Sequence, residues 1–171
     1  MMTLIYHLIY RPKVSISVMG WEQAVLKGHY INSINEKGRL SIPSKFRDVL
    51  KEWGTENLIV TKSIDPCLLA FAPDDWERVA KLASGLSNVK REDIWFKRHV
   101  VGSAEECLLD AQGRILIPSG LREYADLKKK CLLVGIVDRI EIWDQDTYNK
   151  SMEEALEDSE KLREGLAKLG L

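Results

Sequence analysis

Two stretches of the chain share one pattern of apolar and polar positions. The segment GRLSIPSKFR starts at Gly38 and alternates apolar with polar residues, which predicts a short strand that Pro43 ends because it lacks an N–H. Ser44 then stands where a helix cap is expected, and Gly54 where the helix is expected to stop. Between them, apolar residues recur on one helical face: Phe46, Val49, Leu50 and Trp53.

The second copy, GRILIPSGLR, starts at Gly113, which is 75 positions later (113 − 38). Pro118 ends its strand, Ser119 is the predicted cap, and the helical face repeats at Leu121, Tyr124 and Ala125. Aligning 34–50 with 109–125 gives six identities in 17 positions. Chance would give about one, so the pattern indicates an internal repeat.

Strand patterns surround both copies, so each unit is expected to read β–turn–β–α–β–β. The expected strands are 29–35, 39–42, 57–63 and 67–73 in the first unit, and 106–110, 114–117, 131–137 and 140–145 in the second. A unit of about 45 residues is small for independent stability, which favours one core shared by both. The predicted fold class is α+β, with two tandem β-β-α-β-β (AbrB-like) units in one pseudo-two-fold, barrel-like core.

The same patterns divide the chain into five segments. Asp74 and Asp75 are expected to cap a helix, a second helix is expected to start near Asn88, and Asp144 or Asp146 to cap the last one. The segments are an N-terminal extension (1–24), a first domain (29–72), a helical linker (73–103), a second domain (104–147) and a C-terminal helix (148–171). That helix carries an apolar stripe: Tyr148, Met152, Ala155, Leu162, Leu166 and Leu169.

Composition narrows the function classes. The 171 residues hold 25 Lys and Arg against 26 Asp and Glu, a net charge of −1, so a nucleic-acid surface would need locally clustered charge. No P-loop, GxSxG or HExxH motif is present, and no metal-ligand spacing, which argues against an enzyme, a cofactor or a metal site. The apolar run near the N-terminus is too short to span a bilayer. Three cysteines are expected to be buried free thiols: Cys67, Cys107 and Cys131.

Basic residues gather at the first copy. Between Lys27 and Arg47 there are five bases and one acid, a local charge of +4. Arg39 follows the predicted turn, and Arg114 repeats it in the second copy. A two-stranded ribbon fits the major groove of DNA, where arginines bind phosphates or the edge of guanine. The alternative is a scaffold role, in which the arginines pair with acids such as Asp110.

Several segments together resemble the MraZ family: GHYINSINEKGRLSIPSKFRDVL, CLLAFAPDDWE, GSAEECLLDAQGRILIP and RIEIWD. The resemblance implies two SpoVT-AbrB-type domains and a ring-like homo-oligomer. It implies a cytoplasmic, nucleoid-associated transcriptional regulator that binds repeated DNA boxes upstream of the division and cell-wall gene cluster. The expected partners are double-stranded DNA and further copies of the chain, with no membrane and no small-molecule substrate.

The family's DxxxR signature falls on Asp110–Arg114, while the first copy has Asn35 at the position of the aspartate. The resemblance implies that Asn35 and Asp110 orient the arginines. With the local charge, it implies a DNA-binding set: Lys37, Arg39, Lys45, Arg47, Gln112, Arg114 and Arg122. The alternative function is an oligomeric protein-interaction scaffold that contacts a partner through its linker helices and acidic tail.

Overall fold

A computed structural model describes residues 24–157 and residue 167. The predicted N-terminal extension therefore lies outside the described residues except for Ala24. So do Leu162, Leu166 and Leu169, the last three members of the predicted apolar stripe.

The described elements follow the predicted order twice. The first repeat has β1 (Leu26–Ser33), β2 (Arg39–Ser41), α2 (Ser44–Glu52), β3 (Asn57–Lys62) and β4 (Leu68–Phe71). The second has β5 (Glu105–Leu108), β6 (Arg114–Leu116), α5 (Ser119–Tyr124), β7 (Lys130–Val137) and β8 (Arg139–Asp144). Between them lie α3 (Pro73–Ser84), α4 (Arg91–His99) and the 3₁₀ turn η1 (Val101–Ser103), and α6 (Gln145–Glu157) follows. The fold is mixed α+β, as predicted.

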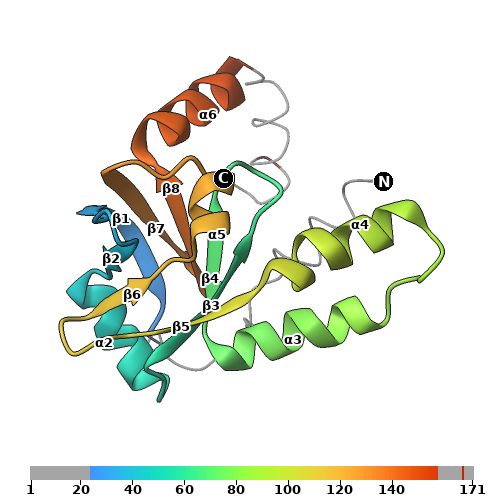
Figure 1. Cartoon of the computed structure of the whole chain (residues 1–171), viewed down its shortest axis with the longest axis horizontal. Coiled ribbons are helices and arrows are strands. Elements are labelled where there is room, and N and C mark those ends of the chain that lie inside the picture. The colour runs from blue at the N-terminus through green and yellow to red at the C-terminus, as the bar shows by residue number, and fades with distance from the viewer. Residues whose placement is uncertain (1–23, 158–166, 168–171) are drawn as a thin grey trace.

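Most strand pairs join the two repeats. A six-stranded sheet has the order β1-β7-β8-β4-β3-β5, and β2 pairs with β6 in a separate two-stranded ribbon (Figure 1). All these pairs are antiparallel, and only β3–β4 and β7–β8 lie within one repeat. If each strand is exchanged with its counterpart in the other repeat (β1 with β5, β3 with β7, β4 with β8), the same order results, read from the opposite edge. The repeats are therefore related by a pseudo-two-fold axis. The sheet keeps β1 and β5 as its edges, so these strands do not close into the predicted barrel.

One hydrophobic core is shared by the repeats, as the small size of each unit predicts. Equivalent residues from both copies meet in it: Leu40 and Ile115, Ile42 and Ile117, Phe46 and Leu121, Leu50 and Ala125. Each of these side chains is almost fully buried. The Phe46 ring meets Tyr30 edge-on at a centroid distance of 4.9 Å. The core therefore fixes α2 and α5 against the ribbon between them.

Two prolines start the short helices, in place of the predicted serine caps. Pro43 and Pro118 are the N-caps of α2 and α5, and neither helix has a side-chain cap. The Pro43 carbonyl accepts the N–H groups of Phe46 and Arg47 at 3.0 Å, which are the first hydrogen bonds of α2. Gly54 stops α2 as predicted, with φ +73° and its N–H bonded to the Lys51 carbonyl.

The capping predictions for the other helices had mixed outcomes. Asp144 caps α6 as predicted, since its Oδ1 accepts the N–H of Asp146 at 3.1 Å. Helix α3 begins at Pro73, so the two aspartates after it lie in the first turn. Helix α4 begins at Arg91 rather than near Asn88, and in the turn before it the Ser87 hydroxyl accepts the N–H groups of Val89 and Lys90.

Helices α3 and α4 extend to the side of the sheet away from the β2–β6 ribbon (Figure 1). They enclose a second cluster with Phe71, Val79 and Phe96, against which Trp76 packs. Trp95 is 47% exposed and stacks on His99 at 4.4 Å, while His99 contacts the Ser63 carbonyl through Nε2. No helix in the described part of the chain is long and apolar enough to cross a membrane.

Candidate nucleic-acid interface

The β2–β6 ribbon carries the repeated arginines on its outer face. Its register pairs Arg39 with Leu116, Leu40 with Ile115 and Ser41 with Arg114. The central pair is buried, and side chains alternate between faces along a strand, so the two arginines share the opposite face. Arg39 is exposed and Arg114 is partly exposed. The ribbon thus presents two guanidinium groups on a diagonal, related by the pseudo-two-fold axis.

A tight turn precedes each strand of the ribbon, and each turn is tied to the other repeat. Gly38 and Gly113 donate back to the carbonyls of Asn35 and Asp110, both at 2.8 Å. Their φ values of +82° and +71° favour glycine. The carbonyls of the two glycines accept N–H groups at 2.9 Å from Ile117 and Ile42 respectively. Each turn is therefore held by the strand that leaves the other turn.

The helix arginines cross between the repeats. A Cβ placed on Gly113 would lie 2.6 Å from the Cδ of Arg47, and one on Gly38 would lie 2.9 Å from the Nε of Arg122. Arg47 of α2 therefore covers the second turn, and Arg122 of α5 covers the first. The sequence gives no local signal for this crossing, because it arises from strand exchange between the repeats.

The second turn holds its arginine firmly. Asp110 Oδ2 accepts the Arg114 Nε–H at 2.9 Å and lies 2.8 Å from Nη2, while Oδ1 accepts the backbone N–H groups of Gln112 and Arg114. Arg114 also donates to the side-chain oxygen of Gln112. The hydrogen bond from the Arg114 side chain, followed by the backbone N–H groups, lowers the pKa of Asp110. The guanidinium is fixed in direction before any ligand arrives.

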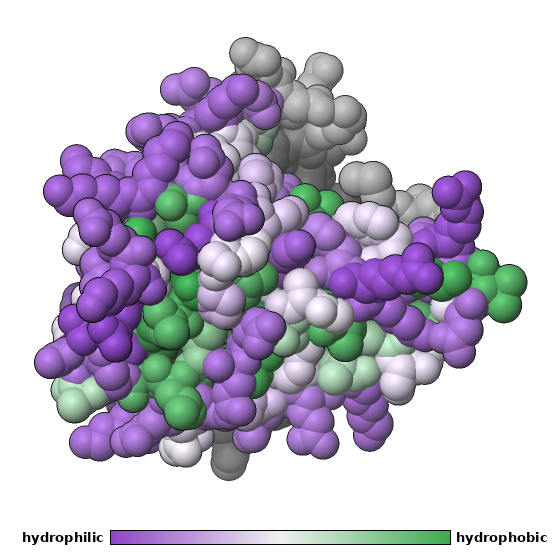
Figure 2. Space-filling model, viewed as in Figure 1, coloured by the Kyte–Doolittle hydropathy of each residue, from purple (hydrophilic) through white to green (hydrophobic). Residues whose placement is uncertain are grey.

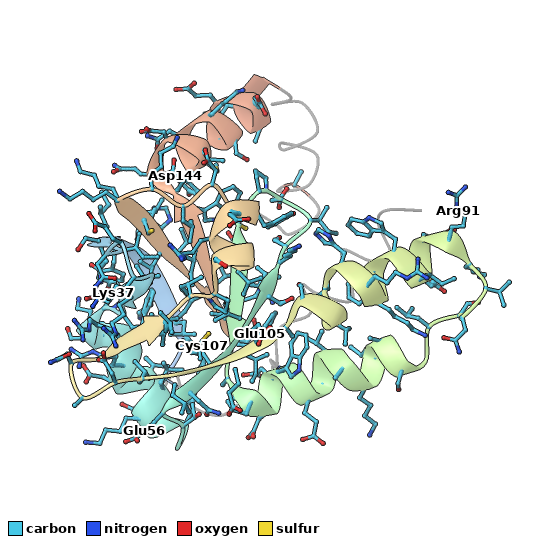
Figure 3. The ribbon with its side chains drawn as sticks, viewed as in Figure 1. Lys37, Glu56, Arg91, Glu105, Cys107 and Asp144 are labelled. Carbon is cyan, nitrogen blue, oxygen red and sulfur yellow. The ribbon has the colours of Figure 1, made fainter. Side chains whose placement is uncertain are left out.

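The first turn leaves its arginine unrestrained. Asn35 Oδ1 accepts only the backbone N–H of Arg39, at 2.9 Å, so the amide shapes the turn without reaching the guanidinium. Within the described residues, five predicted DNA-binding side chains form no ion pair: Lys37, Arg39, Lys45, Arg47 and Arg122. Lys37 lies exposed in the turn (Figure 3). Lys45 lies exposed in the first turn of α2.

An open groove of about 690 Å³ lies beside the first turn. Its lining residues are Ile34, Asn35, Glu36, Lys37, Arg122, Leu127, Lys128 and Lys129. The Arg122 Nε is buried and has no hydrogen-bond partner in the described structure. Sequence reasoning missed Lys128 and Lys129, although the run LKKK after α5 was visible as a charge cluster. Hydrophilic side chains dominate the surface at this end of the molecule (Figure 2).

The described residues offer no metal centre, since no group of His, Cys, Asp and Glu among them is arranged to hold an ion. All three cysteines are buried and free, as predicted. Burial, reinforced by the carboxylates of Glu105 and Glu106, raises the pKa of Cys107 to about 11. Thiols held neutral in this way are poor nucleophiles and poor metal ligands.

Comparison with known proteins agrees with the repeat. A family model described as "MraZ protein, putative antitoxin-like" matches twice, at residues 26–98 and 100–168. A protein of Syntrophobacter fumaroxidans named transcriptional regulator MraZ is 41% identical over 145 residues, which cover 85% of this chain and 96% of that relative. A protein of the same name from Pediococcus pentosaceus is 39% identical over 144 residues, 84% of this chain and 98% of its own length. The chain belongs to the MraZ family.

Proposed function

We propose that this protein is a sequence-specific DNA-binding transcriptional regulator, and that the outer face of the β2–β6 ribbon contacts DNA. The supporting observation is the diagonal pair of arginines, Arg39 and Arg114, on a two-stranded ribbon held by core residues of both repeats. A ribbon of this kind fits the major groove. The names of the two relatives, both transcriptional regulators, support the same role.

The two arginines are suited to different contacts. Arg114 is held by Asp110 and Gln112, and a fixed guanidinium suits the two parallel hydrogen bonds that read guanine. Arg39 has no side-chain partner among the described residues, so its charge is available to a phosphate. The supporting residues would be Lys37, Lys45, Arg47, Gln112 and Arg122.

The finer parts of the proposal rest on the family. Residues 29–72 and 104–147 would be SpoVT-AbrB-type domains, and the chain would form a ring-like homo-oligomer on repeated boxes upstream of the division and cell-wall genes, in the nucleoid. Exposed apolar side chains on α3, on α4 and in the loop between them support self-association: Leu82, Val89 and Trp95. Several weak contacts on one assembly would add through effective concentration.

The test is fluorescence anisotropy with a duplex that carries direct repeats, taken from upstream of the protein's own gene, and with a shuffled duplex. Arg39→Ala and Arg114→Ala should each weaken binding, and the double variant should abolish the preference for the repeats. Arg91→Ala is the matched control, because Arg91 is exposed on α4 far from the ribbon (Figure 3). Sizing each variant separates lost contact from lost assembly.

A protein-interaction scaffold is the second candidate, favoured by the same exposed side chains of the α3–α4 extension. It predicts a partner that co-purifies after nuclease treatment. Unchanged DNA affinity in the double arginine variant would remove the ribbon from the interface and favour this scaffold.

A further inference from the structure

The two ends of the ribbon have equivalent backbones. The N–H of Ile34, just before the first turn, bonds to the Lys129 carbonyl at 3.1 Å. The N–H of Leu109, just before the second turn, bonds to the Glu56 carbonyl at 2.9 Å. Ile34 and Leu109 are equivalent positions, since 109 − 34 = 75. The loop after α5 therefore occupies at the first end the place that the loop after α2 occupies at the second.

The charges at these equivalent positions differ. Lys129 corresponds to Glu56, and Lys128 to the uncharged Thr55. Both lysines and Glu56 are exposed, so the difference lies on the surface. Lys37 marks the first end of the ribbon and Glu56 the second, and the two residues lie apart on the molecule (Figure 3).

The residues that line the groove at the first end carry more positive than negative charge, although Asp126 and Asp144 lie close to Lys128. Four bases and one acid line its groove: Lys37, Arg122, Lys128 and Lys129 with Glu36. Of the four bases, only Lys128 has an ion-pair partner in the described structure, Asp126 at 3.3 Å, and both of these side chains are well exposed. A solvent-exposed pair of this kind is weak and screened by salt.

The second end is balanced by comparison. Arg47 and Arg114 lie here with the carboxylate of Asp110, and the acidic residue Glu56 contacts this end through its backbone carbonyl. Arg114 already forms an ion pair and a hydrogen bond with Asp110. Only Arg47 lacks an ion pair among the described residues there.

We propose that the groove beside the first turn is a phosphate-binding site for the DNA backbone, with Lys128 and Lys129 as its previously unassigned ligands. The second end has no lysines at the corresponding positions, so each subunit would bind the duplex backbone more strongly at the first end of the ribbon. This inference rests on the proposed DNA-binding function. It adds that the two ends of the ribbon differ in how they contact the DNA backbone. Lysine binds phosphate as a mobile point charge, which suits an open groove of this size.

The test is the salt dependence of DNA binding. Each phosphate contact contributes about 0.9 to the slope of log K against log salt concentration. The double variant Lys128→Gln/Lys129→Gln should make that slope less negative by about 1.8 for each subunit that contacts the duplex, with repeat-carrying and with shuffled duplexes alike, because phosphates carry no sequence information. The matched control is Lys81→Gln/Lys90→Gln on the α3–α4 extension, which removes the same charge from exposed positions; with the assembly unchanged by sizing, it should leave the slope within error.

The outcomes distinguish a failure of the proposed phosphate site from a failure of the proposed DNA-binding function. Absence of DNA binding by the unaltered protein refutes the proposed function itself. DNA binding with equal slopes for the two double variants refutes only the phosphate site. Calorimetry with inorganic phosphate adds a further arm. If the unaltered protein binds free phosphate and the Lys128/Lys129 variant does not, while DNA slopes are equal, the groove serves a small anion and the assignment to DNA is wrong.

Discussion

Gly38→Ala tests whether the crossed turns stabilise the ribbon. The glycine has φ +82°, where a side chain costs about 1–2 kcal/mol for an L-residue. Its new Cβ would lie 2.8 Å from the Ile117 carbonyl oxygen, so the backbone segments at Gly38 and Ile117 must move apart. That movement strains the bond from the Ile117 N–H to the Gly38 carbonyl, which contributes about 1 kcal/mol. The expected loss is about 2–3 kcal/mol of unfolding free energy.

Urea denaturation at one fixed protein concentration measures this loss, since self-association shifts apparent stability. Gly120→Ala is the control of opposite sign. Gly120 lies exposed in α5, has no positive φ, and a Cβ there meets nothing within 4 Å. Alanine in a helix is more stable than glycine by about 0.5–1 kcal/mol, so this variant should gain stability. Equal unfolding free energies for the two variants would refute the argument from the turn.

Two other predictions concern the pairing of the second turn and the shared core. Asp110→Asn makes the second turn resemble the first, with its Asn35, and should weaken DNA affinity about fivefold, because a charge-assisted pair becomes neutral. Since the pKa of Asp110 is lowered in the folded state, its contribution to stability is complete above an ordinary Asp pKa of about 3.9 and is lost as the pH falls through the lower folded value. The difference in unfolding free energy between wild type and variant should therefore shrink only below about pH 4; a difference that disappears between pH 7 and 5 would contradict the pairing. Phe46→Ala should cost about 3–5 kcal/mol in urea denaturation, because Phe46 is 1% exposed and packs edge-on against Tyr30; a cost below 1 kcal/mol would mean that the site lies outside the core.

The element order could be predicted because its signals are local. Alternation around Leu40 and Ile115 marks the short strands, and Gly54 marks a helix end. Which strands pair with each other could not be predicted, because the β1–β7 and β3–β5 pairs depend on contacts between positions far apart in the chain. Every local pattern here fits strands paired within a repeat equally well, and only the shared core decides between the arrangements.

The candidate site was predicted in part for the same reason. Asp110 and Arg114 are four positions apart at one turn, so the sequence offered Asp110 as a possible partner of the arginine, and the family resemblance implied the same pair. The contact of Arg47 with the Gly113 turn arises from exchange between repeats and leaves no local trace. Lys129 was visible in a charge run, but only the hydrogen bond from Ile34 to its carbonyl brings it to the first turn.

The pairing of most strands across the repeats has a consequence for how this protein can change. If two separate identical chains built the same ribbon, every substitution would occur at both ends at once. Here one polypeptide encodes the two halves independently, so a mutation alters a single end while the interlocked strands hold both in place. Joining the halves in one gene thus gives the molecule a defined head and tail, even though its backbone is nearly symmetric.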